Sequence, residues 1–447
     1  KTVEGQRPKD LMDLFYTIVD KIPEPYAEGS SRGAAAGFKS RAEALANPLQ
    51  IMVTAMLYSD YVGRIAVGRV TAGKIAPGMP VMMVARSGEQ FKQRVLEVEV
   101  FEALGRVKSQ EVSAGDICAV IGLDHVEIGA TITDFENPRP MTPVSVDEPT
   151  VTMAFRVNDS PFAGRDGKFV TGRQVGERLI KELEKNVALR VDRVMGDDSW
   201  KVSGRGLMHL GVLIETMRRE GFELSVGKPT VIMKQIDGVE CEPVETLAVD
   251  CPEASQSDVM SLVLGRRGEL RSMDAKAGTS GWIHMEFKVP SRALFGLRTL
   301  MLTTTRGEAV MYHNLLGYEP VRGEAPHRAA GVMIGGEGGA VTAYSLDRLY
   351  DRGDFFVKPT DEIYMGQIVG EHCKDNDLEI NLVINKKLSN VRASGSDDAA
   401  KIKPMRQMSL EACLEYIESD EMVEITPNFI RMRKRYLTEN ERKRFDK

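Results

Sequence analysis

The spacing of apolar and polar residues changes along the chain, and each change predicts a different kind of structure. Apolar residues recur at helical spacing over 11–19, which predicts a helix near the N-terminus. From 48 to 146 they alternate with polar residues in short runs between Gly-containing turns, a pattern typical of a β-barrel or sandwich. In the first run, we expect one strand face to carry Ile51, Val53, Ala55 and Leu57.

Two later segments share one order of elements. Over 147–233 the pattern predicts a strand, a helix, a strand, a second helix and a final strand, with Gly221 ending the second helix. Over 234–327 the order repeats, and we expect Ser291 to cap the second helix there. Each segment therefore predicts a ferredoxin-like sandwich, in which helices cover one face of an antiparallel sheet.

The remaining segment, 328–447, predicts a mixed fold. We expect strands at 341–345, 362–371 and 378–383, a helix after Ser409, two short strands and a charged tail. The fold class is therefore multidomain α+β, with a β-barrel, two ferredoxin-like α/β sandwiches and a mixed α+β C-terminal domain. The expected domains are 1–47, 48–146, 147–233, 234–327 and 328–447.

Composition supports a globular protein in a reducing compartment. The 447 residues carry 59 Lys and Arg against 65 Asp and Glu, a net charge of −6, and 42% of them are hydrophobic. The five cysteines are scattered, which argues against a disulfide framework. No apolar stretch is long enough for a membrane helix, and residues 1–10 lack the apolar core of a secretory signal. A net acidic chain is also not a typical nucleic-acid binder.

Motifs for chemistry are almost missing from the sequence. Gly-Lys occurs three times, never followed by the Ser or Thr of a phosphate-binding loop, and no spacing suits a metal site. We therefore predict no catalytic, cofactor-binding or metal-binding residues, and that the chain as given is not an enzyme. The glycine-rich run from Gly335 to Gly339 lacks the last glycine of a dinucleotide motif, so a turn is favoured. A nucleotide-binding enzyme built on this run is kept as an alternative.

Positive charge gathers in the last quarter of the chain. Residues 385–408 carry six basic and two acidic side chains, a net charge of +4, and 431–447 carry eight and three, a net charge of +5. Basic residues with Asn, Ser and Gly favour contacts to phosphate and 2′-hydroxyl groups, so we predict that folded RNA binds here. The candidate RNA-binding residues are Lys386, Lys387, Asn390, Arg392, Ser394, Lys401, Lys403, Arg406, Arg431, Arg433, Lys434 and Arg435.

Several motifs together resemble one known family. The motifs lie at 14–23, 60–69, 158–171, 203–210, 242–245, 266–268, 386–395 and 437–440. They are similar to the BipA/TypA family of ribosome-associated translational GTPases, which is related to elongation factor G. The motif at 386–395, including Lys386, Lys387 and Arg392, and the one at 437–440 resemble the C-terminal domain peculiar to this family. The alternative relatives are elongation factor G itself, LepA and the ribosome-protection proteins.

The resemblance implies a function as well as a fold. The resemblance implies that this chain is a fragment that lacks the GTPase domain apart from its last helix. It also implies a long linker over 29–47. GTP and Mg²⁺ are therefore expected in the absent domain, and no cofactor is expected in this chain. The expected partners are the ribosome, through large-subunit RNA, A-site tRNA and ribosomal proteins at the factor site, and no membrane. It further implies translation under stress, large-subunit assembly, a monomer, and the bacterial cytoplasm or an organelle stroma or matrix.

Overall fold

The structure is a computed structural model, and it divides the chain into two compact units, Lys1–Asp147 with Lys181–Val187 and Glu148–Ile180 with Ala188–Lys447. Helix α1 (Met12–Lys21) confirms the predicted N-terminal helix, and α2 (Arg41–Ala46) is capped by the Ser40 hydroxyl. The described residues are 11–22, 38, 40–59, 61–124, 126–143, 148–183, 186, 188–194, 196, 198–275, 281–323, 328–385 and 404–445.

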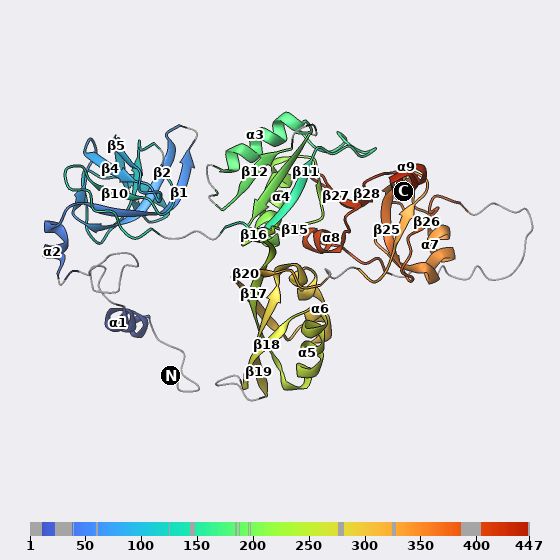
Figure 1. The fold of residues 1–447 in the computed structure, drawn as a ribbon. Helices are drawn as coiled ribbons and strands as arrows, with labels where there is room; N and C mark the ends of the chain where they lie inside the picture. Colours follow the sequence, from blue (N-terminus) through green and yellow to red (C-terminus); the bar gives the residue numbers. More distant parts are fainter. Residues whose placement is uncertain are drawn as a thin grey trace, which may run out of the picture. The chain divides into compact units, whose positions relative to one another are not determined.

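The first unit holds an eight-stranded antiparallel sheet that surrounds one apolar core (Figure 1). Its hydrogen-bonded order is β5-β4-β10-β1-β2-β9-β6-β7, and within the described residues the end strands β5 and β7 do not pair, so the expected barrel is not closed. The short strands β3 (Lys74–Ile75) and β8 (Val112–Ser113) pair separately. The eight strands are β1 (Gln50–Ser59), β2 (Gly63–Ala72), β4 (Pro80–Val84), β5 (Gln90–Arg94), β6 (Glu97–Glu102), β7 (Gly105–Lys108), β9 (Ile117–Ile121) and β10 (Thr131–Asp134).

Strand β1 departs from the predicted alternation. Ile51 and Val53 are buried as expected, but the pairing with β2 shifts register between Val53 and Ala55. An extra residue in one strand moves every later side chain to the other face of the sheet. As a result, Met56 contacts the core, whereas Leu57 is 40% exposed.

The first ferredoxin-like module lies in the second unit, except for the last turn of its first helix, from Lys181 onward. Its sheet has the order β12-β13-β11-β14, which is the antiparallel order expected of this fold. Gly221 follows α4 with a φ of 98°, and its N–H bonds back to the last turn, as predicted. The elements are β11 (Val151–Arg156), α3 (Gly172–Leu183), β12 (Arg190–Arg193), β13 (Ser199–Gly204), α4 (Leu207–Glu220), β14 (Leu224–Gly227) and the short β15 (Thr230–Val231).

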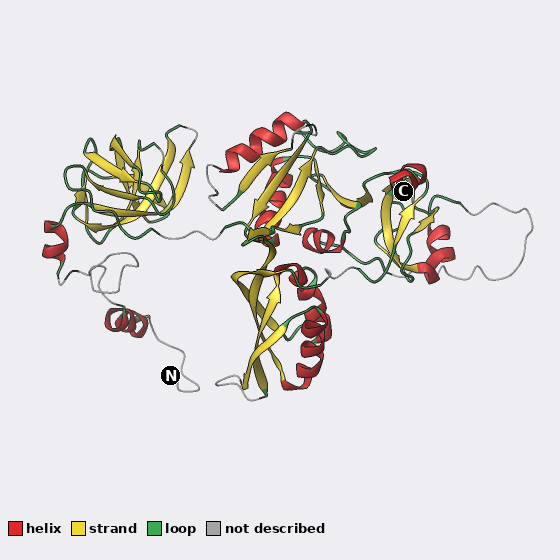
Figure 2. Ribbon diagram, viewed as in Figure 1, coloured by secondary structure: helices red, strands yellow, loops and turns green. Residues whose placement is uncertain are grey.

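The second ferredoxin-like module repeats this topology with longer strands. Strand β17 lies between β19 and β20, β18 is the outer partner of β19, and β16 forms a hairpin with β17. Helices α5 and α6 cover one face of the sheet, where Leu247, Val263 and Met301 are buried together (Figure 1, Figure 2). The elements are β16 (Lys234–Ile236), β17 (Val239–Pro252), α5 (Gln256–Gly265), β18 (Glu269–Ala275), β19 (Trp282–Pro290), α6 (Leu297–Thr304) and β20 (Val310–Pro320).

The end segment shares its main sheet with the first module. Strand β14 pairs with β27, β27 pairs with β28, and β28 pairs with β25, so one sheet of eleven strands crosses position 328. The main sheet of residues 328–447 is therefore continuous with that of the first module, and within the described part of this segment only β22 and β24 pair separately, as a two-stranded sheet. The elements are β21 (Val332–Gly335), β22 (Gly339–Ala340), α7 (Ala343–Leu349), β23 (Gly353–Phe355), β24 (Glu362–Ile363), β25 (Gln367–His372), β26 (Leu378–Ile380), α8 (Leu410–Tyr416), β27 (Glu421–Ile425), β28 (Ile430–Lys434) and α9 (Glu439–Phe445).

Three local predictions differ from the structure. The strand expected over 341–345 is wrong, because the Thr342 hydroxyl accepts the Ser345 N–H and caps the helix α7. Ser291 begins a 3-10 turn, and α6 starts only after Gly296, whose φ is 70°. The charged tail contains the helix α9. Among the described residues, no helix is long and apolar enough to span a membrane.

Candidate nucleic-acid interface

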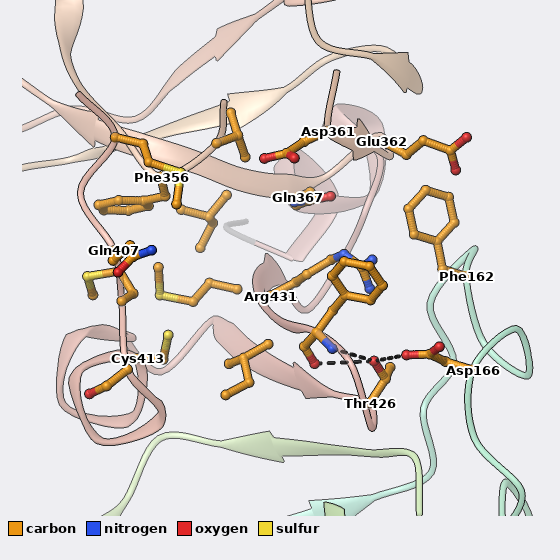
Figure 3. A pocket seen from close by; sticks show the side chains of 18 of the residues that line it. Phe162, Asp166, Phe356, Asp361, Glu362, Gln367, Gln407, Cys413, Thr426 and Arg431 are labelled. Carbon is orange, nitrogen blue, oxygen red and sulfur yellow. Dashed lines mark hydrogen bonds between the residues drawn. The ribbon is translucent and has the colours of Figure 1, made fainter. Parts of the chain in front are cut away.

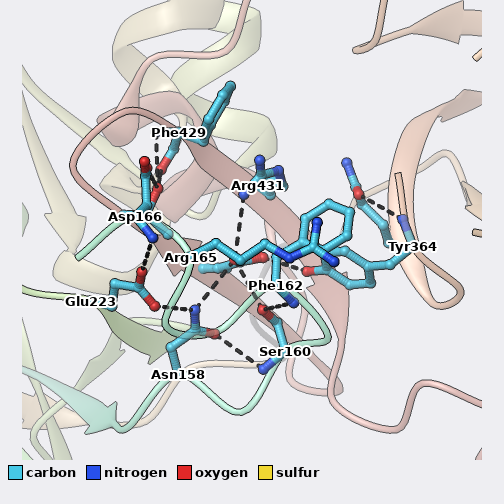
Figure 4. Close-up of polar contacts among 12 residues, drawn as sticks. Asn158, Ser160, Phe162, Arg165, Asp166, Glu223, Tyr364, Phe429 and Arg431 are labelled. Carbon is cyan, nitrogen blue, oxygen red and sulfur yellow. Dashed lines mark hydrogen bonds and ion pairs between the residues drawn. The ribbon is translucent and has the colours of Figure 1, made fainter. Parts of the chain in front are cut away.

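A loop of the first ferredoxin-like module, 158–168, lies between that module and the end segment. It follows β11 and folds around the buried carboxylate of Glu223 (Figure 4). That carboxylate accepts the backbone N–H groups of Gly164 (2.8 Å), Asp166 (3.0 Å) and Gly167 (2.6 Å). Burial alone would raise the pKa of Glu223, but these backbone donors bring it below its ordinary value. The charged carboxylate therefore holds the loop in one conformation.

A second buried carboxylate, Glu424 on β27, connects the loop to the end segment. It accepts hydrogen bonds from the Ser160 hydroxyl (3.0 Å) and the Asn158 amide (3.3 Å). It also accepts from the Tyr364 hydroxyl at 2.6 Å and pairs with Arg431 at 3.4 Å. Burial and the nearby carboxylate raise the pKa of Tyr364 well above its ordinary value, so this hydroxyl keeps its proton and donates.

The same loop also holds the turn of the β27–β28 hairpin. Asp166 accepts hydrogen bonds from the Thr426 hydroxyl (2.8 Å) and from the N–H and side-chain amide of Asn428 (3.1 Å and 2.5 Å). Burial would raise the pKa of Asp166, but its bonds to Asn428 and Thr426 lower it overall. We name these contacts of Glu223, Glu424 and Asp166 the loop–hairpin junction.

Arginine and phenylalanine side chains stack on one another beside this junction. The guanidinium of Arg165 lies 4.2 Å from the centre of the Phe162 ring. The guanidinium of Arg431 lies 5.1 Å from the Phe162 ring and 4.3 Å from the Phe429 ring. Such cation–π contacts hold guanidinium groups over aromatic faces. We name these four residues the Arg–Phe ladder (Figure 4).

A pocket of about 840 Å³ opens next to the Arg–Phe ladder (Figure 3). All its lining residues come from the second unit, and they include the four residues of the ladder and the carboxylates of Asp361 and Glu362. One part of the lining is apolar, with Met405, Met408, Met432, Phe356, Val357, Ile368, Ile430 and Cys413. Burial raises the pKa of Cys413 to about 12, so this thiol is not a nucleophile.

The described members of the predicted RNA-binding set differ in their exposure and in their partners. Arg431 belongs to the Arg–Phe ladder, whereas the partly exposed Arg406 pairs with Glu371 at 3.2 Å. Arg435 is exposed, and its guanidinium lies 5.6 Å from the Tyr436 ring. Phosphate contact through Arg406 and Arg435 stays a prediction.

Arg433 and Lys434 have a structural role that the sequence did not predict. Arg433 is 1% exposed and pairs with Asp159. Lys434 is 3% exposed, and its ammonium lies 2.6 Å from Asp377, 2.7 Å from Asp420 and 3.0 Å from Glu421. Burial would lower the pKa of Lys434, but Glu421 and its other partners raise it above its ordinary value. Both cationic side chains are buried and paired with acids, which argues against direct RNA contact by the two residues.

The acidic cluster around Lys434 also resembles a cation site at first sight. Oxygens of Asp377, Asp420 and Glu421 lie within 4.8 Å of one another. The Lys434 ammonium occupies the space between them, and Arg328 pairs with Glu421 at 2.9 Å. Protein cations therefore neutralise this cluster, and it gives no reason to expect a metal there.

Other members of the predicted set fall outside the described residues. These are Lys386, Lys387, Asn390, Arg392, Ser394, Lys401 and Lys403. The glycine-rich run, by contrast, is described: Gly335 ends β21 and Gly339 begins β22. The run is thus a connection between two strands, as the sequence favoured, and its geometry adds nothing for the nucleotide-binding alternative.

Sequence reasoning did not identify the residues of the loop–hairpin junction as a site. One signal was present: Glu223 and Glu424 stand inside apolar runs that were predicted as strands. A carboxylate that is buried in a strand needs several hydrogen-bond donors. The Arg–Phe ladder had no such signal, because its residues come from 162–165 and 429–431 and meet only in the folded chain.

Comparison with family models separates three parts of the chain. The model of the TypA/BipA C-terminal domain matches residues 330–439. The elongation factor G C-terminus model matches 239–329, and the elongation factor Tu domain 2 model matches 63–133. The match over 330–439 includes the β27–β28 hairpin and three members of the predicted RNA-binding set on it, Arg431, Arg433 and Lys434.

Proteins named large ribosomal subunit assembly factor BipA are similar to almost the whole chain. The protein of Bacillus subtilis is 41% identical over 98% of this chain and 69% of its own length. The protein of Salmonella typhimurium is 42% identical over 98% of this chain and 69% of its own length. The protein of Synechocystis is 42% identical over 95% of this chain and 68% of its own length. The sequence predicts that this chain is not an enzyme. That prediction is wrong, because the similar proteins are members of BipA, a family of GTPases. At this identity and coverage, the chain belongs to the BipA family.

Proposed function

We propose that this protein binds the large ribosomal subunit and acts in its assembly as a BipA-type translational GTPase. The observation that carries the proposal is the identity over 98% of the chain to proteins named as large-subunit assembly factors. The loop–hairpin junction supports it, because it fixes the end segment to the first ferredoxin-like module and so presents Arg406 and Arg435 from a rigid support.

The proposal includes direct contact between this protein and RNA. Basic side chains at 386–403, together with Arg406 and Arg435, contact phosphates of large-subunit RNA and the A-site tRNA. Ribosomal proteins at the factor site are further partners, and the protein acts as a monomer during translation under stress. GTP and Mg²⁺ are the proposed cofactors of the factor. The proposed location is the bacterial cytoplasm or an organelle stroma or matrix.

The alternative relatives are weaker candidates. LepA, ribosome-protection proteins and elongation factor G were alternatives because parts of the chain resemble all of these factors. The TypA/BipA C-terminal domain model matches 330–439, the segment that best discriminates among them. The proposal therefore follows the BipA family.

Co-sedimentation with purified large subunits at several salt concentrations tests the proposal. Replacing Lys386, Lys387 and Arg392 with Ala removes three proposed phosphate contacts, so binding weakens and its dependence on log salt becomes shallower by about 2–3. A matched control replaces the exposed basic residues Lys92, Arg94 and Lys108 on the eight-stranded sheet and keeps the binding of the unmodified chain. Equal binding and equal salt dependence in both variants would contradict the RNA contact.

A further inference from the structure

The Arg–Phe ladder is buried at its middle and open at its ends. The side chain of Arg431, between the two rings, is 13% exposed. Phe429 at one end is 52% exposed, and the side chain of Arg165 at the other end is 59% exposed. The residues between are held by the loop–hairpin junction, so the stack is already ordered before anything binds. Each end therefore exposes part of a planar group, Phe429 at one end and Arg165 at the other.

Nucleobases are planar groups of the right kind for such ends. Unpaired bases of RNA stack on aromatic rings and on guanidinium planes in the same way. The adjoining pocket of about 840 Å³ falls within the range of small-ligand sites, so it has room for one nucleotide. The pocket and the open ends of the ladder therefore fit a single base that has left its own stack.

The carboxylates in the pocket indicate which base fits. Asp361 accepts the Lys358 N–H at 2.9 Å, and Glu362 pairs with Arg165 at 3.3 Å. Within the described residues, each of these contacts uses one carboxylate oxygen. Ionised carboxylates accept hydrogen bonds, and guanine presents two adjacent donors, N1–H and the N2 amino group, on its pairing edge. Adenine, cytosine and uracil each present one donor group there, next to acceptors that a carboxylate repels.

We propose that this groove binds one unpaired guanine base of RNA. The base stacks on an open end of the Arg–Phe ladder and donates N1–H and N2–H to Asp361 or Glu362. The inference rests on the proposed function for its RNA partner and deepens it, because it adds a base-specific contact to the phosphate contacts. An apolar peptide segment is the competing occupant, since several methionines line the pocket. The exposed guanidinium and the two carboxylates favour the base, because an apolar peptide would remove water from them and add no hydrogen bond in its place.

Fluorescence anisotropy with labelled RNA pentamers tests the proposal. The full chain is titrated against UUGUU, UUAUU and UUUUU at one salt concentration. We expect UUGUU to bind about tenfold more tightly than the other two. Phe429→Ala and Arg165→Ala each remove the exposed side chain at one end of the ladder. The base stacks on one of these ends, so at least one of the two substitutions should weaken UUGUU binding about tenfold. Phe429→Trp keeps the stacking surface and should keep the affinity.

Two further variants separate base recognition from general effects. Tyr344→Ala removes an exposed aromatic ring from α7, outside the pocket, and should leave all three affinities unchanged. Asp361→Asn with Glu362→Gln should remove the preference for UUGUU over UUAUU while UUUUU binding stays the same or rises. Melting curves confirm that each variant is folded.

The outcomes distinguish this proposal from the proposed function. Replacing Lys386, Lys387 and Arg392 should weaken binding to all three pentamers alike, because phosphate contacts ignore the base. Equal affinity for the three pentamers, or no effect of either ladder variant, would overturn the guanine site even if ribosome binding is intact. Displacement of bound RNA by an apolar peptide but not by GMP would overturn it in favour of a peptide groove.

Discussion

The two ferredoxin-like modules have the same topology but very different fourth strands. In the first module, β14 has four residues, and Leu224, Ser225 and Val226 on it are all buried. Strand β27 pairs along its free edge. In the second module, β20 has eleven residues, pairs only with β17 within the described residues, and exposes most of its side chains. One module is thus extended by the end segment, and the other keeps an open edge.

The difference shows how one fold can take two roles. A sheet edge carries unpaired N–H and C=O groups, so another strand can extend it. The first module uses this property inside the molecule, and the buried acids Glu223 and Glu424 fix the position of the added strands. The second module lacks such a pair at its edge in the described part of the chain. The junction is therefore the element that turns a repeated module into a support for the Arg–Phe ladder.

Of the changes that test this difference between the modules, removing Glu424 should have the largest effect on the free energy of unfolding. Glu424→Ala deletes the acceptor of Tyr364, Ser160 and Asn158 and leaves Arg431 without its carboxylate partner. Removing one partner of a buried ion pair lowers the free energy of unfolding by about 3–5 kcal/mol. Urea unfolding followed by circular dichroism measures the loss.

The matched control for this prediction lies in the second module. Glu286 is on β19 and its side chain is 44% exposed, so Glu286→Ala should change the free energy of unfolding by less than about 0.5 kcal/mol. A loss from Glu286→Ala as large as that from Glu424→Ala would show that the junction is not what distinguishes the modules.

Lys434→Met should have the next largest effect. The substitution keeps an unbranched apolar side chain, one atom shorter, but removes the cation that lies among Asp377, Asp420 and Glu421. The fully buried Glu421 then keeps Arg328 but loses Lys434, and the partly exposed aspartates lose the same cation. The chain should be destabilised by about 2–3 kcal/mol, as measured by thermal unfolding. The exposed Lys201 on β13 provides the control, since Lys201→Met should change little. A harmless Lys434→Met would instead favour the predicted RNA contact for Lys434.

Sequence patterns predicted the modules well because their cores follow simple periods. The strand–helix order, the end of α4 at Gly221 and the Ser409 cap of α8 are all confirmed. Local hydrogen bonds and buried stripes decide these features, and both can be read from neighbouring residues. The BipA family was likewise identified from short motifs, and the comparisons confirm it.

Features that depend on distant residues could not be predicted in this way. The bulge in β1 reverses which face Leu57 occupies, and nothing in the local alternation marks it. The charge of Lys434 predicts an RNA contact, but charge alone does not reveal burial beside acids from two other segments, at Asp377 and at 420–421. The Arg–Phe ladder joins residues more than 260 positions apart.

Acid should weaken the junction through Glu223. Its folded pKa lies below the ordinary value of 4.5, so its stabilising contribution is fully present at pH values above 4.5 and is lost as the pH falls through the folded pKa. Glu223→Gln should cost about 2 kcal/mol at pH 7, because three N–H donors lose a charged acceptor. The difference between the two proteins, measured by urea unfolding from pH 7 to pH 3, should shrink with acid. A constant difference would mean that the charge of Glu223 does not stabilise the loop.

The smallest expected change in the free energy of unfolding comes from a direct comparison of the two fourth strands, β14 and β20. Val226 on β14 is fully buried between Phe155 and Val423, whereas Tyr312 on β20 is 51% exposed opposite Ala248. Val226→Thr places a hydroxyl in the core and should cost about 1–2 kcal/mol. Tyr312→Thr keeps a good strand former on an exposed face and should cost less than about 0.5 kcal/mol. Thermal unfolding of both variants measures the two values side by side, and equal costs would mean that β20 is as well covered as β14.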